Sequence, residues 1–239
     1  MTETMQRWSM DALGRENLKL TQAPVPQPGP GEVRVRVNAV ALNYRDKMVV
    51  EGTMPIPLSF PFTPASDMAG VVDSIGEGVT RFHPGARVIS TFFPEWIDGK
   101  PQADARNLPY KTSGGYFQGM LSEYVIVNEG ALVASPETLD DAEASTLPCA
   151  GLTAWFALVE RGQLRAGQSV LVQGTGGVAI FALQIAKAHG AEVFVTSGSD
   201  EKLALAKKLG ASQGINRLKG DWAENTLALT QDRGIDHII

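Results

Sequence analysis

Apolar and polar positions alternate along several short segments in the first half of the chain. Segment 32–40, Glu-Val-Arg-Val-Arg-Val-Asn-Ala-Val, places an apolar side chain at nearly every second position, which is typical of a strand with one buried face. Further strand-like runs, separated by glycine and proline, span residues 68–75, 86–91 and 121–127. Short strands at this spacing predict a small β-barrel or sandwich.

The pattern changes after Leu139. Segments 140–145 and 149–161 are rich in helix formers, and strand–helix alternation follows to residue 239. The strands that we expect in this part begin near Val170, Glu192, Gly214 and Ile235, and a helix spans 200–209. We therefore predict a β domain over residues 1–129 and an α/β domain over residues 130–239. A doubly wound sheet has about six strands, so four strands indicate either a small sheet or a chain that is a fragment.

A glycine-rich turn separates the first of these strands from its helix. Gly174, Gly176 and Ala179 occupy the small-residue positions of the pattern G-x-G-x-x-G/A. The first glycine permits a tight turn, the second lets the backbone approach a pyrophosphate, and the alanine lets the helix lie close to the sheet. Free N–H groups at the start of that helix favour phosphate. The pattern predicts a dinucleotide-binding βαβ unit, and a turn that serves packing alone is the alternative.

The composition excludes several classes of function. The chain has 239 residues, 44% of them hydrophobic and 20% charged, which is ordinary for a globular protein. A net charge of -5 and an isoelectric point near 5.3 argue against nucleic acid or an anionic membrane as a partner. The single cysteine, Cys149, excludes an internal disulfide and a cysteine-rich metal lobe. We expect a cytoplasmic location.

The chain resembles the medium-chain dehydrogenase/reductase superfamily, in particular its zinc-lacking branch near quinone oxidoreductases and zinc-type alcohol dehydrogenase-like proteins. The residues that carry the resemblance are Ala41-Leu-Asn-Tyr-Arg-Asp46, Ala69-Gly-Val-Val-Asp-Ser-Ile-Gly-Glu-Gly-Val79, Pro84-Gly-Ala-Arg-Val88, Leu147-Pro-Cys-Ala-Gly-Leu-Thr-Ala-Trp155 and Val172-Gln-Gly-Thr-Gly-Gly-Val178. The resemblance implies a GroES-like β-barrel followed by a Rossmann domain, here incomplete at its C-terminus, and a homodimer when the protein is full length.

The same resemblance bears on metal binding. Zinc-binding members of the family carry cysteine where this chain has Asn43, and Gly-His-Glu where it has Ala65-Ser66-Asp67. A catalytic zinc needs about three ligands from cysteine, histidine and carboxylates. Because Asn43 and Ser66 are poor zinc ligands and Asp67 alone cannot hold the ion, we expect no zinc.

The end of the second α/β strand decides the cofactor. An acid there normally binds the ribose of NAD and repels a 2′-phosphate, and the resemblance puts Ser197 at this position. Gly198 permits close approach, Ser199 can donate a hydrogen bond, and Lys202 and Arg217 can attract the phosphate, unless both are only solvated surface charges. Asp200 is expected to cap the helix that follows. We predict that NADP(H) is preferred over NAD(H).

Further cofactor contacts follow from the turn and from the resemblance. Thr175, Gly177 and Val178 complete the turn and the first residues of its helix. The resemblance places Thr153 beside the nicotinamide. The alternative for Thr153 is a threonine inside a helix that bonds its own backbone.

A zinc-free site needs another group to polarise the carbonyl that accepts hydride. Asn43 and Tyr44 stand in the family's first catalytic segment, and both can donate a hydrogen bond to a developing oxyanion. Tyr44 is preferred because a phenol is a better acid than an amide. Asp46 is expected to hold the loop through an arginine pair, and Cys149 to be a buried packing residue. The aromatic insert 92–96 could line the substrate pocket.

Two functions from different classes remain open. The first is an oxidoreductase that moves hydride between a nicotinamide cofactor and an alcohol, carbonyl, enone or quinone. The second is a nucleotide-binding protein without turnover, such as a crystallin-like relative or a truncated product.

Overall fold

A computed structural model describes residues 3–99 and 111–239 of the chain. It divides into two compact units, Met1–Cys149 and Ala150–Ile239. The boundary predicted from the sequence lay earlier, between residues 129 and 130. The contacts place it later because β7 (Leu132–Ala134) pairs with β5 (Arg87–Ser90) and α2 (Asp141–Ala144) packs on the same sheet.

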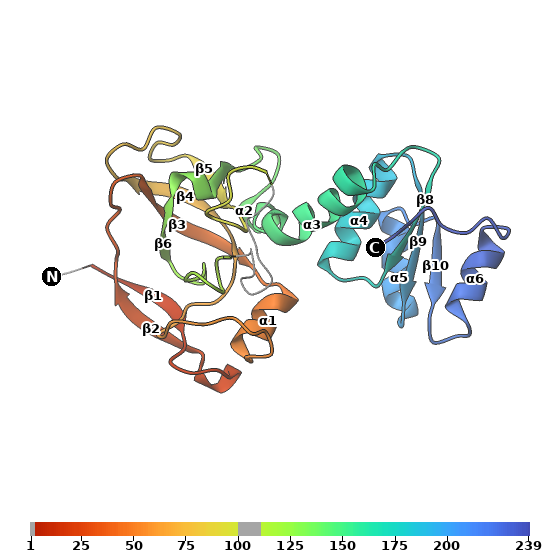
Figure 1. Ribbon diagram of the computed structural model, residues 1–239, viewed down its shortest axis with the longest axis horizontal. Coiled ribbons are helices and arrows are strands. Elements are labelled where there is room, and N and C mark those ends of the chain that lie inside the picture. The colour runs from red at the N-terminus through yellow and green to blue at the C-terminus, as the bar shows by residue number, and fades with distance from the viewer. Residues whose placement is uncertain (1–2, 100–110) are drawn as a thin grey trace. The chain divides into compact units, whose positions relative to one another are not determined.

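The first unit is built on a five-stranded antiparallel sheet with the order β6-β3-β4-β5-β7 (Figure 1). Its remaining strands are β3 (Glu32–Ala41), β4 (Asp67–Ile75) and β6 (Tyr124–Asn128). All four strands predicted in this half are therefore confirmed. The alternation in β3 buries Val33 and Val35 completely, against Met68, Val72 and Leu132. That buried face is what the period-two pattern encodes.

Several elements of the first unit went unpredicted. A hairpin pairs β1 (Thr4–Ser9) with β2 (Lys19–Pro24), and α1 (Tyr44–Val50) packs Val49 and Val50 against Met10 and Phe62. Short 3₁₀ turns, η1 (Arg15–Asn17) and η2 (Glu129–Ala131), join the strands. With seven residues, α1 is too short to show a helical period in the sequence.

The second unit is a parallel sheet with helices on both faces. Strand order is β10-β9-β8-β11, and the elements are β8 (Ser169–Gln173), α4 (Gly177–Ala188), β9 (Glu192–Ser197), α5 (Asp200–Leu209), β10 (Gln213–Asn216), α6 (Trp222–Leu229) and β11 (His237–Ile238). This order, 3-2-1-4 in chain order, is that of the first four of the six strands of a Rossmann sheet. The predicted strands and the helix over 200–209 are confirmed, whereas α6 was not predicted.

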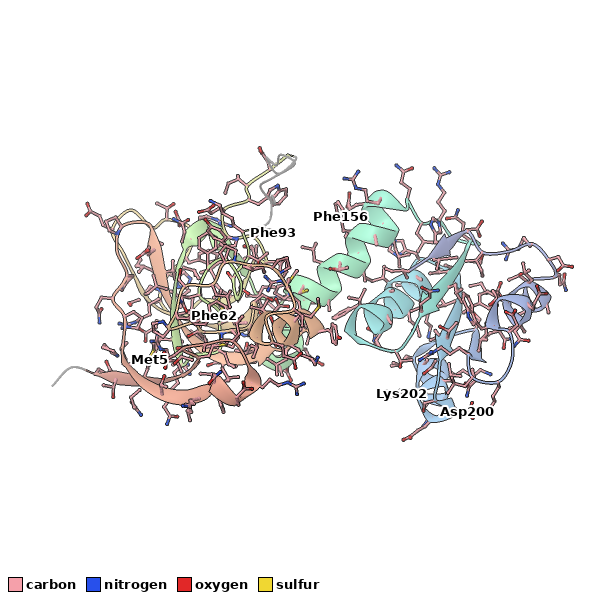
Figure 2. The ribbon with its side chains drawn as sticks, turned by 60° about the horizontal axis from the view of Figure 1, so that its bottom comes forward. Met5, Phe62, Phe93, Phe156, Asp200 and Lys202 are labelled. Carbon is pink, nitrogen blue, oxygen red and sulfur yellow. The ribbon has the colours of Figure 1, made fainter. Side chains whose placement is uncertain are left out.

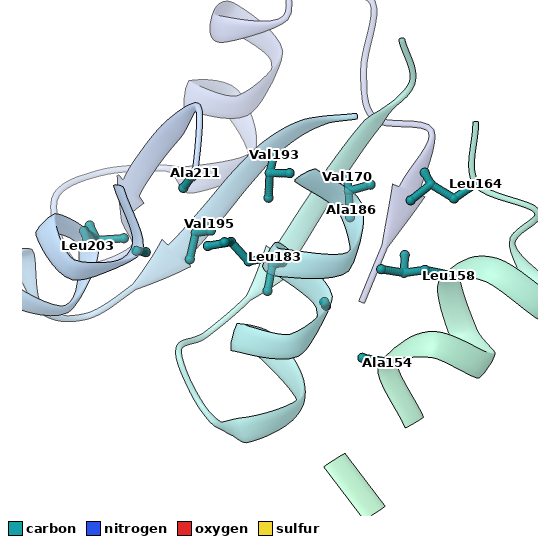
Figure 3. Close-up of a cluster of buried hydrophobic side chains, with 13 residues drawn as sticks. Ala154, Leu158, Leu164, Val170, Leu183, Ala186, Val193, Val195, Leu203 and Ala211 are labelled. Carbon is teal, nitrogen blue, oxygen red and sulfur yellow. The ribbon is translucent and has the colours of Figure 1, made fainter. Parts of the chain in front are cut away.

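Apolar side chains fill both faces of this sheet, as a parallel sheet requires. Val170 and Val193 meet Leu183 of α4 on one face (Figure 3). On the other face, Leu171 and Phe194 meet Trp222 of α6. A helical stretch precedes the sheet and consists of η3 (Leu147–Gly151), α3 (Leu152–Trp155) and η4 (Phe156–Arg161), of which η3 and η4 are π-helical.

No helix within residues 3–99 and 111–239 combines the length and the apolar character that a membrane crossing requires.

Candidate functional site

The glycine turn between β8 and α4 has the backbone geometry that the sequence predicted. Gly174 has φ 97°, in the region that favours glycine, and its N–H donates to Thr196 O at 3.0 Å. A Cβ at Gly174 or Gly176 would meet nothing within 4 Å, so space is open beside the turn. Thr175 lies within this turn. Through the bond to Thr196, the turn is joined to the carboxyl end of β9.

Helix α4 begins directly after this open turn. Gly176 is its N-cap, and no side chain of the described residues caps it, so the first N–H groups of Gly177 and Val178 are free for an anion. Val178 and Ala179 pack against the core of the unit, as expected for the third small position. A Cβ at Gly177 would lie 3.4 Å from Ala150 Cβ, so the helical stretch that carries Thr153 packs here.

The carboxyl end of β9 gathers the residues predicted to select the cofactor. Ser197 is only 5% exposed, and its Oγ accepts from the Ser199 N–H at 3.3 Å. Ser199 in turn accepts from the Lys202 N–H at 3.3 Å and is the N-cap of α5. The prediction that Asp200 caps this helix is therefore wrong. Asp200 is the first residue of α5, and its carboxylate bonds Asn216 and Lys219 instead.

Arg217 follows β10 and lies against the same loop. Its N–H donates to Ser197 O at 3.0 Å, and its Nη2 lies 3.7 Å from the position that a Cβ would take on Gly198. Neither Arg217 nor Lys202 forms a side-chain hydrogen bond or ion pair with any described residue, and both are exposed. Lys202 and Arg217 are thus two positive charges without an ion-pair partner among the described residues, and the neighbouring residues 197–199 include no carboxylate.

Thr153 is an exposed residue of α3. Its hydroxyl makes no hydrogen bond to the described part of the chain, so the alternative of a back-bonded helical threonine finds no support in this geometry. Its role beside a nicotinamide stays a prediction.

In the first unit, Asp67 is the centre of a buried hydrogen-bond cluster. Its carboxylate is fully buried and accepts from Ser66 Oγ at 2.6 Å, from the Cys149 N–H at 2.9 Å and from Asn43 Nδ2 at 3.1 Å. Burial raises the pKa of Asp67 above its ordinary value, against the effect of these three donors. The positions at which zinc-binding relatives are expected to hold the metal are here bonded to one another.

Asp46 is the second buried carboxylate of this region. Its Oδ2 accepts from the Asn43 N–H at 2.7 Å, while its Oδ1 has no partner among the described residues. Burial raises the pKa of Asp46 to about 6. The prediction that Asp46 pairs with an arginine is wrong, because the neighbouring Arg45 donates instead to Thr112 Oγ1 and to the carbonyls of Ser113 and Gly114.

The raised pKa of Asp46 predicts how stability depends on pH. Between the ordinary pKa of 3.8 and a value of about 6, the folded chain binds more protons at this group than the unfolded chain. Stability is therefore lost as pH rises through this window, by at most about 3 kcal/mol. Asp46→Asn keeps an acceptor for Asn43 and cannot ionise, so its stability relative to wild type is expected to rise from about pH 4.5 to about pH 7.5. Urea unfolding at both pH values measures this.

The exposed Asp11→Asn is the control for that experiment. Identical pH profiles of stability for wild type and Asp46→Asn would show that Asp46 titrates normally in the folded chain.

Cys149 and Tyr44 differ sharply in their surroundings. Burial, with the charges of Asp67 and Asp46, raises the pKa of the Cys149 thiol to about 11, which makes it a poor nucleophile at neutral pH.

Tyr44 is 73% exposed, and Lys47 Nζ lies 5.4 Å from its ring centroid. Its hydroxyl bonds to no described residue, so the phenol is free to meet a ligand. In the aromatic insert, Phe92 packs its ring edge-on against Phe93 at 4.9 Å.

Within residues 3–99 and 111–239, no three histidine, cysteine, aspartate or glutamate side chains come together as a metal site. The sequence did not predict the bond of Asn43 to Asp67 or the roles of Asn216 and Lys219, both of which bond Asp200. No local pattern marks these contacts, because the partners are far apart in sequence: Asn43 precedes α1 whereas Asp67 begins β4, and Asp200 begins α5 whereas Asn216 ends β10.

Comparison with known proteins places both units. The alcohol dehydrogenase GroES-like domain family matches residues 29–137, and the zinc-binding dehydrogenase family matches residues 177–239. The crystal structure of a putative alcohol dehydrogenase from Sinorhizobium meliloti 1021 is similar with a TM-score of 0.97 and 60% identity, covering 100% of this chain and 70% of that one.

Curated relatives are longer than this chain. A zinc-type alcohol dehydrogenase-like protein of Schizosaccharomyces pombe is 44% identical over 84% of this chain and 58% of its own length. The quinone oxidoreductase of Rattus norvegicus is 33% identical over 84% of this chain and 55% of its own. The chain thus spans little more than half the length of these relatives. The matches to both domain families, together with the identity to full solved structures, show that the chain belongs to the medium-chain dehydrogenase/reductase superfamily.

Proposed function

We propose that the chain is part of an oxidoreductase that moves hydride between NADP(H) and a small alcohol, carbonyl, enone or quinone, without zinc. The observation that carries the proposal is the open Gly174–Gly177 turn at the uncapped start of α4, joined to the carboxyl end of β9. Ligands of open α/β sheets bind at the carboxyl ends of the strands. The proposal includes a reducing cytoplasm as the location and a homodimer when the protein is full length.

The preference for NADP(H) is supported by charge. Ser197 offers hydrogen-bonding capacity without a negative charge, and Lys202 and Arg217 are cations that no described residue neutralises. The carboxylate of Asp200, the nearest acid in sequence, is neutralised by Lys219 Nζ at 2.6 Å. A 2′-phosphate would therefore meet attraction rather than repulsion.

The experiment that tests this function has two stages. Fluorescence titration of the chain with NADPH and NADH measures binding, and the proposal expects the lower dissociation constant for NADPH. Oxidation of NADPH by a full-length version is then measured against aldehydes, enones and quinones. Binding without oxidation would favour the second candidate, a nucleotide-binding protein without turnover, and binding of neither nucleotide would reject both.

Purified, tag-free protein is expected to contain no stoichiometric zinc. The reason is that Asn43 and Ser66 are poor ligands and that both bond to Asp67, the only carboxylate of the set. Elemental analysis after dialysis measures the metal content. About one zinc per chain would contradict the prediction.

A further inference from the structure

The carboxylate of Asp200 lies in a position where it could oppose a phosphate. Asp200 is the first residue of α5 and follows directly after the loop of Ser197, Gly198 and Ser199 (Figure 2). It is also the first acidic residue after the carboxyl end of β9. A free carboxylate here would add a like charge beside the proposed 2′-phosphate position and weaken NADPH binding.

Two residues at the carboxyl end of β10 bond this carboxylate, whose side chain is 62% exposed. Asn216 Nδ2 donates to Asp200 Oδ1 at 2.7 Å, and Lys219 Nζ lies 2.6 Å from Asp200 Oδ2. Each oxygen thus has its own donor, and one of the donors carries a positive charge. We call Asp200, Asn216 and Lys219 the Asp200 clasp.

Asn216 also shapes the turn that carries Arg217. Its Oδ1 accepts from the Leu218 N–H at 3.0 Å, and its carbonyl accepts from the Lys219 N–H at 3.0 Å. One side chain therefore fixes the turn and bonds Asp200 at the same time. Arg217 lies within this turn, and its guanidinium lies next to Gly198.

We infer that the Asp200 clasp sets cofactor specificity: Asn216 and Lys219 withdraw the Asp200 carboxylate from the nucleotide, and Asn216 positions Arg217 toward its 2′-phosphate. The inference rests on the proposed binding of a dinucleotide at this edge of the sheet. Asn216 and Lys219 are positioning residues here, since they act through Asp200 and Arg217.

The test is a double-mutant cycle on the 239-residue chain, with dissociation constants for NADPH and NADH measured by fluorescence. Asn216→Asp removes the donor and sets a second carboxylate against Asp200, so the preference for NADPH over NADH is expected to fall by about fivefold or more. The double variant that combines Asn216→Asp with Asp200→Asn again has one carboxylate and one amide, as wild type does, but at exchanged positions. The preference of this double variant is expected to return to within about twofold of wild type.

A second variant covers the case in which Asn216→Asp does not fold. Lys219→Met removes the positive partner without adding a charge, and it is expected to lower the preference by about two- to fivefold. The same substitution in an Asp200→Asn background is expected to change nothing, because no carboxylate is left to be released. A lysine that touched the phosphate directly would lower the preference in both backgrounds, which would overturn the inference.

Gln184→Glu, on the exposed surface of α4, adds the same charge elsewhere in the unit and is the matched control. An unchanged preference in Asn216→Asp, equal weakening of both nucleotides, or failure of Asp200→Asn to restore the preference would each overturn the inference. The wild-type ratio of the two dissociation constants tests the proposed preference for NADP(H), whereas the change in that ratio between variants tests the clasp. A wild-type chain that binds neither nucleotide overturns both.

Discussion

Replacing Ser197 by aspartate is expected to abolish or reverse the preference for NADPH over NADH. Ser197 is nearly buried at the carboxyl end of β9, and its backbone and side chain bond to Arg217 and Ser199. A carboxylate there would accept bonds from the ribose hydroxyls of NADH and repel the 2′-phosphate. A charge-assisted hydrogen bond contributes roughly 1.5–3 kcal/mol, so the ratio of the two dissociation constants is expected to change by about ten- to a hundredfold.

The measurement is a fluorescence titration of wild type and variant with each nucleotide, alongside thermal melting to show that both are folded. Ser212→Asp is the matched control, because Ser212 lies just before β10, at the opposite end of the sheet, and its Oγ accepts a backbone N–H from Val193. If Ser197→Asp keeps the wild-type ratio, another residue discriminates between the cofactors.

Replacing Tyr44 by phenylalanine is expected to lower the turnover number of the full-length enzyme by about 10²–10³-fold, the usual cost of removing one oxyanion donor. Hydride addition places negative charge on the carbonyl oxygen, and a preorganised donor must meet that charge. The phenol of Tyr44 is exposed and bonds to no described residue, whereas the Asn43 amide already donates to Asp67. Tyr44 is therefore the better candidate of the two.

Steady-state rates with an established substrate measure this effect. Tyr116→Phe is the control, since Tyr116 is also exposed and also lies beneath a lysine, with Lys111 Nζ 5.0 Å from its ring centroid. A Tyr44→Phe rate within about threefold of wild type would exclude Tyr44 as the donor and leave Asn43 or water.

Periodic and conformational signals in the sequence determined most of the fold. The alternation over residues 32–40 predicted β3, because a sheet with one buried face requires a period of two. The Gly174–Gly176 turn predicted the junction of β8 and α4, since Gly174 adopts a backbone conformation that other residues rarely take. The sequence also predicted the helix over 200–209 and the strands around it. Each of these features depends only on residues that are close together in the sequence.

Tertiary structure alone decided the contacts that connect distant segments. It gave the helix cap to Ser199 rather than Asp200, and the Asp200 carboxylate bonds instead to Asn216 and Lys219 at the end of β10, the strand beside β9. It likewise brought the Cys149 N–H, 82 positions along the chain, onto Asp67. A carboxylate takes whichever donors the fold brings within about 3 Å. Sequence patterns report local periodicity and backbone preference, so they cannot specify which donors those are.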